Sequence, residues 1–347
     1  MKKLLLILAT TALISANNFS LKPIGEKEFT FPYVVSKTKT KQTVADNINT
    51  YLHLEYLELL PNSYKSNPFE AINIKGQMPR LYVHDYRISE NFKFIALSLN
   101  MEGCGAYCEE FEAQKLFLAH NGKHIHAREL FTKKGLKLFD RMNHENIQKT
   151  IKAFLKTGTD EEQVDLYEDC LNAEYKGKVH EHSDFWIEKD KFTLFSGRCS
   201  NHAMRALDDI GDFSNSYSFI ELKNYLSPLG NYLLNKHNKE VLNSESPTGI
   251  YKGKITGKYP IKLSISQIYD DGSLEASYWY EKYKKVIDLS GSYKNGKLKL
   301  YVKKHKPKEK KWVAVEAIVG KVSDGKFKGT WQKLPTGKLL SLEMSLN

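Results

Sequence analysis

The last hundred residues alternate short apolar segments with tight-turn signals, and this rhythm limits the possible folds more than any other feature. About eight such segments follow one another between Gly249 and Leu346. Turn residues stand between them, at Asp270-Asp271-Gly272, Asn295-Gly296, Asp324-Gly325 and Thr336-Gly337. Short alternating strands joined by tight hairpins are typical of up-and-down barrels. The pattern therefore predicts an antiparallel β-barrel over residues 247–347.

This strand pattern resembles a small lipocalin-type barrel. The first strand carries Gly249-Ile250-Tyr251 where lipocalins have Gly-x-Trp, so the resemblance implies a shape and no particular ligand. Several aromatic residues lie on these strands: Tyr278, Trp279, Tyr280, Trp312 and Trp331. We expect the alternating ones among them to fill the barrel interior; the alternative is a stacking surface for sugar or lipid.

Charge is distributed unevenly between the two parts of the chain. The net charge is +11, yet residues 246–347 contain 21 Lys, no Arg and 9 Asp or Glu, which gives +12. Residues 17–245 carry 29 basic and 32 acidic side chains, or −3. The polar segment 235–249, with Pro247 and Gly249, has the composition of a linker. We expect a domain break at 243–247.

Residues 17–243 predict a mixed α+β domain. Apolar residues at helical spacing predict three helices, over residues 43–61, 143–158 and 160–173. Alternating residues predict extended segments, over residues 29–38, 80–88 and 92–101, and two hairpins, over 111–131 and 184–199. The first hairpin is placed on Asn121-Gly122, which suits a type I′ turn. Residues 218–234 close the domain and are expected to be partly helical.

Three segments of this domain match a known pattern: LFLAHNGKHIHARELF (116–131), FWIEKDKFTLFSG (185–197) and FIELKNYLSPLG (219–230). Their order resembles a bacterial extracytoplasmic domain of unknown function. That domain occurs in the outer part of the lysozyme-sensing anti-sigma factor of Gram-positive bacteria and beside the catalytic domain of some peptidoglycan deacetylases. The resemblance implies a sensor or inhibitor that binds a protein such as lysozyme.

The first sixteen residues are typical of a secretory signal peptide. Lys2 and Lys3 precede an apolar run from Leu4 to Ile14, and Ser15-Ala16 ends it with small residues. The run is shorter than the ~20 residues that a membrane-spanning helix needs. We expect cleavage after Ala16, a periplasmic or secreted location, and no transmembrane segment.

Export determines how the four cysteines are interpreted. An oxidising compartment favours disulfides. We expect Cys104 to pair with Cys108, because Gly103 and Gly105 allow a tight turn there, and Cys170 to pair with Cys199. A redox role is disfavoured because the spacing is C-x3-C and not C-x-x-C.

The histidines suggest a metal site only weakly. His124 and His126 stand two residues apart in an expected strand, so both would face one side, where His120 or a carboxylate could complete a zinc site. The favoured alternative is an exposed polar strand face, because nothing fixes a third ligand. We therefore expect neither a metal nor a cofactor.

Hydrolase motifs are incomplete. There is no Gly-x-Ser-x-Gly, and His144-Glu145 begins an H-E-x-x-H motif in which Gln148 takes the last position. Lys156-Thr157-Gly158 is better explained as a helix end than as part of a penicillin-recognising set. No catalytic residue is assigned.

The favoured interpretation is an exported, non-enzymatic binding protein acting at the cell envelope, with an unknown ligand. The alternatives are a sensor or inhibitor that binds a protein such as lysozyme, and an uncharacterised envelope enzyme. The partner would be an anionic envelope component or an extracytoplasmic protein, and not nucleic acid. The expected binding surface is the lysine run KKHKPKEKK, with Lys303, Lys304, Lys306, Lys308, Lys310 and Lys311.

Overall fold

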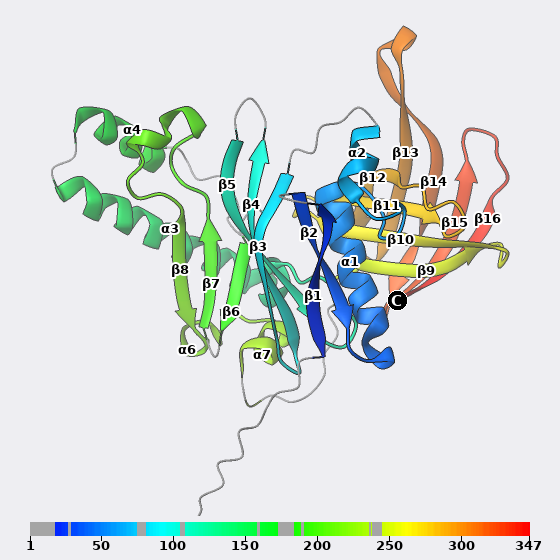
Figure 1. The fold of residues 1–347 in the computed structure, drawn as a ribbon, viewed down its shortest axis with the longest axis horizontal. Coiled ribbons are helices and arrows are strands. Elements are labelled where there is room, and N and C mark those ends of the chain that lie inside the picture. Colours follow the sequence, from blue (N-terminus) through cyan, green and yellow to red (C-terminus); the bar gives the residue numbers. More distant parts are fainter. Residues whose placement is uncertain are drawn as a thin grey trace, which may run out of the picture.

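The computed structural model has a mixed α/β region followed by a closed eight-stranded antiparallel barrel, which confirms the expected fold class (Figure 1). The residues it describes are 18–26, 29–74, 81–104, 108–157, 160–172, 184–188, 191–235, 237 and 245–347. The expected signal peptide and residues 243–244 of the expected domain break lie outside these residues, and both expectations stay predictions.

The barrel follows the up-and-down order that its turns predict. Its strands are β9 (Gly249–Ile255), β10 (Tyr259–Ile268), β11 (Ser273–Tyr280), β12 (Ile287–Lys294), β13 (Lys297–Lys306), β14 (Lys311–Ser323), β15 (Lys326–Lys333) and β16 (Leu340–Leu346). Each strand pairs with the next, and β16 pairs with β9 to close the sheet. Alternate residues from all eight strands, such as Leu263, Tyr278 and Ile318, pack into one buried apolar cluster.

The α/β region is built around a three-stranded sheet. The strands of the whole α/β region are β1 (Phe19–Glu26), β2 (Phe29–Ser36), β3 (Leu81–Glu90), β4 (Phe94–Cys104), β5 (Cys108–Leu118), β6 (Asp184–Glu188), β7 (Lys191–Ser196) and β8 (Phe213–Ser218). Its helices are α1 (Gln42–Leu57), α2 (Pro68–Ile74), α3 (Lys133–Phe154), α4 (Glu161–Asn172), α6 (Phe219–Leu222) and α7 (Pro228–Leu234). The central sheet has the order β3-β4-β5, while β1-β2 and β6-β7-β8 form two further sheets.

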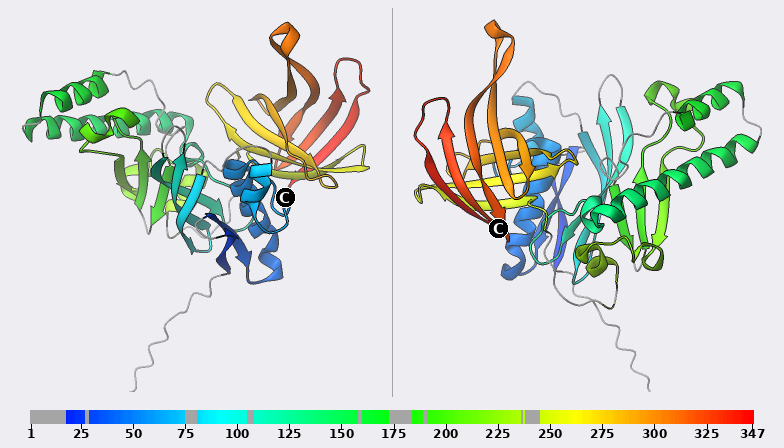
Figure 2. Two further views of the ribbon diagram at one scale, coloured as in Figure 1. Left: turned by 45° about the horizontal axis from the view of Figure 1, so that its top comes forward. Right: turned by 180° about the vertical axis from the view of Figure 1, so that it is seen from behind.

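The central sheet is buried on both faces because its strands alternate between two apolar sets. Leu97 and Phe117 face a cluster that includes Ile48 and Leu52 of α1. Their neighbours, such as Leu116, face a second cluster formed with α3, α7 and the β6-β7-β8 sheet. Helix α1 therefore lies between the central sheet and the barrel (Figures 1 and 2).

The hairpin expected over 111–131 forms only in part. Strand β5 pairs with β4 along its length. Beyond Leu118 the chain turns back, since the Leu118 amide donates to the Lys123 carbonyl oxygen (2.9 Å) and the Ile125 amide to that of Leu116 (2.8 Å), but this pairing ends at one bridge between Phe117 and His124. Gly122 has φ +71, and a Cβ there would lie 2.5 Å from the carbonyl oxygen of Val44 in α1. The glycine therefore serves both the close approach to α1 and the turn after Leu118, whose carbonyl oxygen accepts a hydrogen bond from the Gly122 amide (2.8 Å).

Three other elements differ from the expectation. Helix α3 begins ten residues earlier than predicted, at Lys133, because Thr132 caps it by accepting a hydrogen bond from the Gly135 amide (3.0 Å). Helix α2 and strand β1 were not predicted at all, because each is too short to show a clear period.

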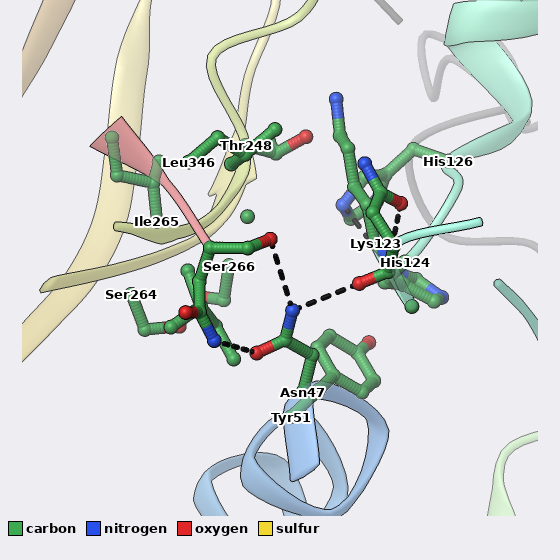
Figure 3. Close-up of a pocket in the computed structure, with 15 residues that line it drawn as sticks. Asn47, Tyr51, Lys123, His124, His126, Thr248, Ser264, Ile265, Ser266 and Leu346 are labelled. Atoms are coloured by element: carbon green, nitrogen blue, oxygen red, sulfur yellow. Dashed lines mark hydrogen bonds between the residues drawn. The ribbon is translucent and has the colours of Figure 1, made fainter. Parts of the chain in front are cut away.

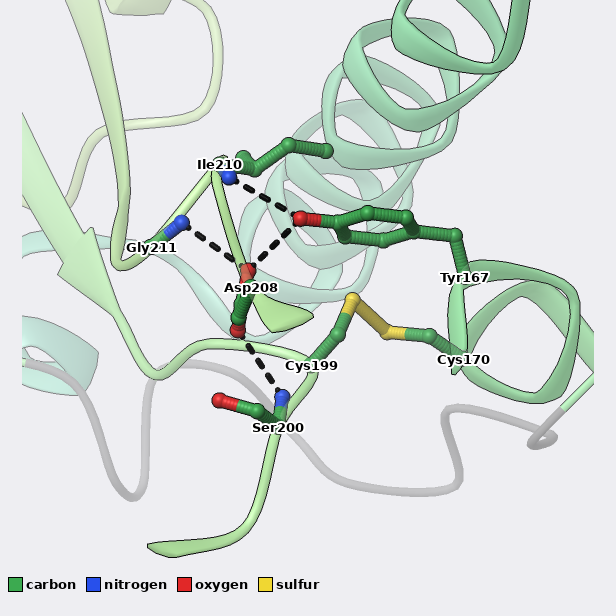
Figure 4. The surroundings of a disulfide bond; sticks show 7 residues. All are labelled: Tyr167, Cys170, Cys199, Ser200, Asp208, Ile210 and Gly211. Atoms are coloured by element: carbon green, nitrogen blue, oxygen red, sulfur yellow. Dashed lines mark hydrogen bonds between the residues drawn. A yellow bond between two sulfur atoms is a disulfide. The ribbon is translucent and has the colours of Figure 1, made fainter. Parts of the chain in front are cut away.

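The disulfide between Cys170 and Cys199 is present and fastens α4 to the loop after β7 (Figure 4). Asp208 organises the same loop by accepting hydrogen bonds from the Ser200 amide (3.0 Å), the Gly211 amide (3.0 Å) and the Tyr167 hydroxyl (2.8 Å). These donors lower the pKa of the Asp208 carboxyl, against the opposing effect of its burial.

Polar groups and an apolar cluster join the α/β region to the barrel. Leu60 packs with Ile250 and Trp279 on the outer face of the barrel. Asn47 donates to the carbonyl oxygen of Asn347 (3.3 Å) and accepts from its side chain (2.7 Å).

A buried ion pair lies at the centre of this contact. The Nζ of Lys123 lies 3.2 Å from the carboxylate of Glu129, and their side chains are only 3% and 5% exposed. The same Nζ donates to the carbonyl oxygen of Ser246 (2.8 Å), and Glu129 accepts from the Thr248 hydroxyl (3.2 Å). The pair therefore binds the segment between β5 and α3 to the chain that enters β9.

Replacing Lys123 with Met should lower the free energy of unfolding by about 3–5 kcal/mol, because the Glu129 charge would be left buried and unpaired. The double variant Lys123→Met/Glu129→Gln should recover part of this loss. Urea denaturation measures both. As a control, Lys328→Met removes an exposed pair with Glu343 (3.8 Å) and should cost about 0–1 kcal/mol. Equal losses for the buried and exposed lysines would contradict the assignment.

Candidate functional site

His124 and His126 lie at the boundary between α1 and the barrel and do not form the exposed strand face that we expected (Figure 3). The His124 ring stacks on Tyr51 with centroids 4.2 Å apart, and its Nδ1 lies 3.4 Å from Nε2 of His126. The expectation was wrong because it rested on a hairpin strand that does not form. Because this segment lies against α1, the His124 ring packs on Tyr51 of that helix and does not face solvent.

The two imidazoles are held neutral. Burial is the largest effect and lowers the pKa of His126 to about 4 and that of His124 well below its usual value. Lys123 and Lys115 lower both pKa values further, while Glu129 raises that of His126. Within the residues that the structure describes, no three His, Cys, Asp or Glu side chains are grouped to hold a metal ion. The expectation that these histidines bind no metal tightly stays a prediction.

Two cavities lie where α1 meets the barrel strands β10 and β11, and the smaller of them is lined by His124 and His126. One has a volume of about 780 Å³ and is lined by Glu55 and Glu275, and the other, of about 240 Å³, contains the ion pair between Lys115 and Asp184 (2.9 Å). Burial and the nearby Glu275 and Asp184 raise the pKa of Glu55, while Lys115 opposes them. Glu275 also accepts a hydrogen bond from the Tyr269 hydroxyl (2.7 Å). The carboxylates here are opposed by a lysine or engaged in protein contacts, so we assign no catalytic group among them.

The expected lysine surface forms the outer end of the β13–β14 hairpin, which extends beyond the rest of the barrel (Figures 1 and 2). Five of its six lysines are exposed: Lys303, Lys304, Lys306, Lys310 and Lys311; the side chain of Lys308 lies outside the described part. Glu309 is the acidic group among them, and it pairs with Lys306 (3.0 Å) and Lys311 (2.6 Å).

Trp312 lies on this hairpin and is 67% exposed, so it is not among the aromatic residues that fill the barrel interior. A bulge after Val302 interrupts the pairing of β13 with β14. Beyond the bulge the two strands leave the barrel, and Trp312 lies opposite His305 with ring centroids 5.4 Å apart. The alternation of side chains along β14 shows which face of the strand Trp312 is on. Beyond the bulge, however, the strand no longer borders the barrel interior, so a residue on that face has no interior to fill.

The other barrel aromatics divide between inside and outside. Tyr278 is buried inside, and Tyr280 and Trp331 pack partly against the interior cluster, in agreement with the expectation. Trp279 is buried on the outer face, against Leu60. The sequence could not identify this position because the α/β region covers that part of the barrel only in the folded chain.

The cysteine expectation is confirmed for Cys170 and Cys199. In the other pair the backbone places Cys104 directly opposite Cys108, and Cys108 is disulfide-bonded. The side chain of Cys104 and residues 105–107 lie outside the described residues, so this pairing stays a prediction.

Comparisons with known proteins assign no family. No family model matches the chain, and no curated protein matches it. A solved structure of a member of the DUF3298 family from Bacteroides fragilis is similar over 64% of this chain and 97% of its own, with 13% identity and a TM-score of 0.41. A likeness of that size assigns neither a family nor an activity. In the described ranges, none of the helices combines the length and the apolar character needed to cross a bilayer.

Non-reducing peptide mapping of the exported protein should show Cys104 joined to Cys108 and Cys170 joined to Cys199. Removing the second bond with Cys170→Ala/Cys199→Ala should lower the free energy of unfolding by about 3.5 kcal/mol, because the bond closes a loop of 29 residues. Free thiols at Cys104 and Cys108, or a peptide joining Cys104 to Cys170, would contradict the predicted pairing.

Stability should fall as the pH is lowered from about 6.5 to about 4. The unfolded chain takes up a proton on His126 near its ordinary pKa of about 6.5, whereas the folded chain takes it up only near 4. Protonation therefore favours the unfolded state in this window, by about 3 kcal/mol for this one side chain at its lower end.

The measurement is urea denaturation at several pH values with wild type and His126→Gln. The variant should show a shallower pH dependence, and the remaining slope should include His53, whose pKa burial also lowers to about 4. Identical slopes for the two proteins would show that His126 is not held neutral by the fold.

Proposed function

We propose that the protein is an exported, non-enzymatic binding protein that associates with an anionic lipid surface of the cell envelope through the β13–β14 hairpin. The observation that carries the proposal is the exposed Trp312 ring among exposed lysines at the end of a projecting hairpin. Export itself rests on the N-terminal sequence and the expected signal peptide.

The charge on the hairpin favours a diffuse anionic surface. Lysine carries a compact, strongly hydrated charge. Unlike arginine, it does not form bidentate hydrogen bonds with a single anionic group. Glu309 offsets part of the charge through Lys306 and Lys311, but no acidic partner within ion-pair distance is found for Lys303, Lys304 or Lys310 in the described part of the chain. These three side chains are therefore the ones most available to anionic headgroups.

Trp312 favours a lipid surface over an acidic wall polymer. A tryptophan ring combines a large apolar area with one N–H donor, and this suits the boundary between headgroups and acyl chains. Leaving such a ring 67% exposed to water forgoes the gain from its burial. Contact with a bilayer would recover it, whereas a hydrated polymer offers little apolar surface.

Co-sedimentation of the mature full chain with lipid vesicles tests the proposal. Binding to vesicles containing phosphatidylglycerol should exceed binding to pure phosphatidylcholine, and it should weaken as ionic strength rises past ~0.1 M, where the Debye length is about 10 Å. Each lysine near an anionic surface contributes about 1 kcal/mol. The triple variant Lys303→Glu/Lys304→Glu/Lys310→Glu should therefore bind at least about a hundredfold more weakly.

A matched variant separates the hairpin from net charge. Lys297, Lys321 and Lys326 are also exposed: Lys297 lies opposite Lys321 at the other end of β13 and β14, and Lys326 begins β15 beside that end. Changing all three to Glu alters the net charge equally and should leave most of the binding intact. An equal loss of vesicle binding in both triple variants would show that binding depends on net charge and not on the hairpin. Binding to acidic wall polymers but not to vesicles would overturn the choice of lipid.

A further inference from the structure

The α/β region has a groove on its surface. It lies between the central sheet and the β6-β7-β8 sheet, on the face of the central sheet that also carries Leu116, and its volume is about 650 Å³. Small-molecule sites have volumes of about 300–1,000 Å³.

The floor of the groove is a row of polar side chains on the central sheet. This row lies on the same face of the sheet as apolar side chains of the buried core. Arg87, Ser98 and Gln114 lie directly opposite one another on β3, β4 and β5. Two residues further along β4 and β5, on the same face, Ala96 and Leu116 belong to the buried core. The polar row is therefore the point at which the buried face opens into the groove.

Gln114 supplies the strongest sign of a ligand. The residue is only 8% exposed, and its Nε2 donates to Ser98 (3.2 Å) and Glu112 (3.4 Å). Its buried Oε1 accepts no hydrogen bond from the part of the protein that the structure describes. A buried acceptor without a donor costs about 1–3 kcal/mol, so the site favours a ligand that brings an O–H or N–H group.

Aromatic side chains form the opposite wall. Trp186 of β6 and Phe195 of β7 both line the groove, and neither ring is fully buried. A sugar ring has an apolar face of C–H groups, which stacks on an aromatic ring, and an edge of hydroxyl groups, which can donate to an acceptor such as Gln114. The wall and the floor therefore match the two sides of one sugar unit.

The charge of the groove restricts the sugar further. Three carboxylates, Glu90, Glu112 and Glu188, line it together with one arginine, Arg87. This net negative charge disfavours the anionic ligands that the lysine hairpin attracts. We propose that the groove binds a neutral oligosaccharide, with Trp186 as the stacking ring and Gln114 as the hydrogen-bond acceptor.

Isothermal titration calorimetry of the full chain tests this proposal with cellotetraose and with the tetrasaccharide of N-acetylglucosamine as probes. At least one should bind. Trp186→Ala should weaken binding about tenfold or more, through the lost ring contact. Gln114→Met keeps the volume of the side chain but removes the acceptor, and it should weaken binding about fivefold or more.

The controls make folding and site effects distinguishable. Circular dichroism and a thermal melt establish that each variant is folded; if Trp186→Ala is not, Gln114→Met still decides. Trp312→Ala should leave sugar binding unchanged, and Gln114→Met should leave vesicle binding unchanged, so failure of one proposal does not imply failure of the other. No binding of either tetrasaccharide at millimolar concentration, tighter binding of an oligogalacturonate or of a neutral peptide, or binding unaffected by Gln114→Met would overturn the proposal.

Discussion

The buried charge of Lys123 is the constraint on which the arrangement of the two halves depends. An ammonium group removed from water must be matched by a counter-charge and by acceptors, and here these come from Glu129 and from the backbone of Ser246. Meeting these requirements fixes the segment between β5 and α3 against the entry to β9. The same segment places a guanidinium nitrogen of Arg128 3.0 Å from the carboxylate of Asp270. Since Asp270 lies in the β10–β11 turn, the contact between the two halves extends to that end of the barrel.

This arrangement separates the two proposed binding surfaces. Helix α1 lies between the central sheet and the barrel, and both views place the β6-β7-β8 sheet and the β13–β14 hairpin on opposite sides of it (Figures 1 and 2). A ligand in the groove beside Trp186 would not touch the hairpin that carries Trp312. The two surfaces also differ in sign, since lysines dominate one and carboxylates the other.

Much of the fold could be predicted from the sequence because its signals are local. Turn residues and period-two alternation define the barrel, and the expected pairing of Cys170 with Cys199 is confirmed. The errors occur where one local signal has two physical causes. Asn121-Gly122 predicts a turn that does form, yet Gly122 also allows a close approach to Val44, and the expected second strand does not continue past one bridge. Trp312 follows the alternation of a barrel strand, yet its strand has already left the barrel.

The groove could not have been predicted at all, because its parts come together only through pairing across the sheet. Arg87, Ser98 and Gln114 are far apart in the sequence, and each is an ordinary polar residue in an alternating strand. Nothing local distinguishes Gln114 from a solvent-facing side chain. Its burial depends on the second sheet, which begins seventy residues later at Asp184. Long-range packing of this kind leaves no periodic trace in a single sequence.

The two proposed surfaces together suggest how weak binding could be sufficient. Lysines on a hairpin give an attraction that salt screens, and one stacking ring with a few hydrogen bonds typically gives modest affinity. A protein held near a surface by the hairpin, however, meets sugars of that surface at a high effective concentration. Under that condition a groove with weak intrinsic affinity is occupied for a large part of the time. The neutral preference of the groove would then provide selectivity among sugars, while the charge of the hairpin would provide retention at the surface.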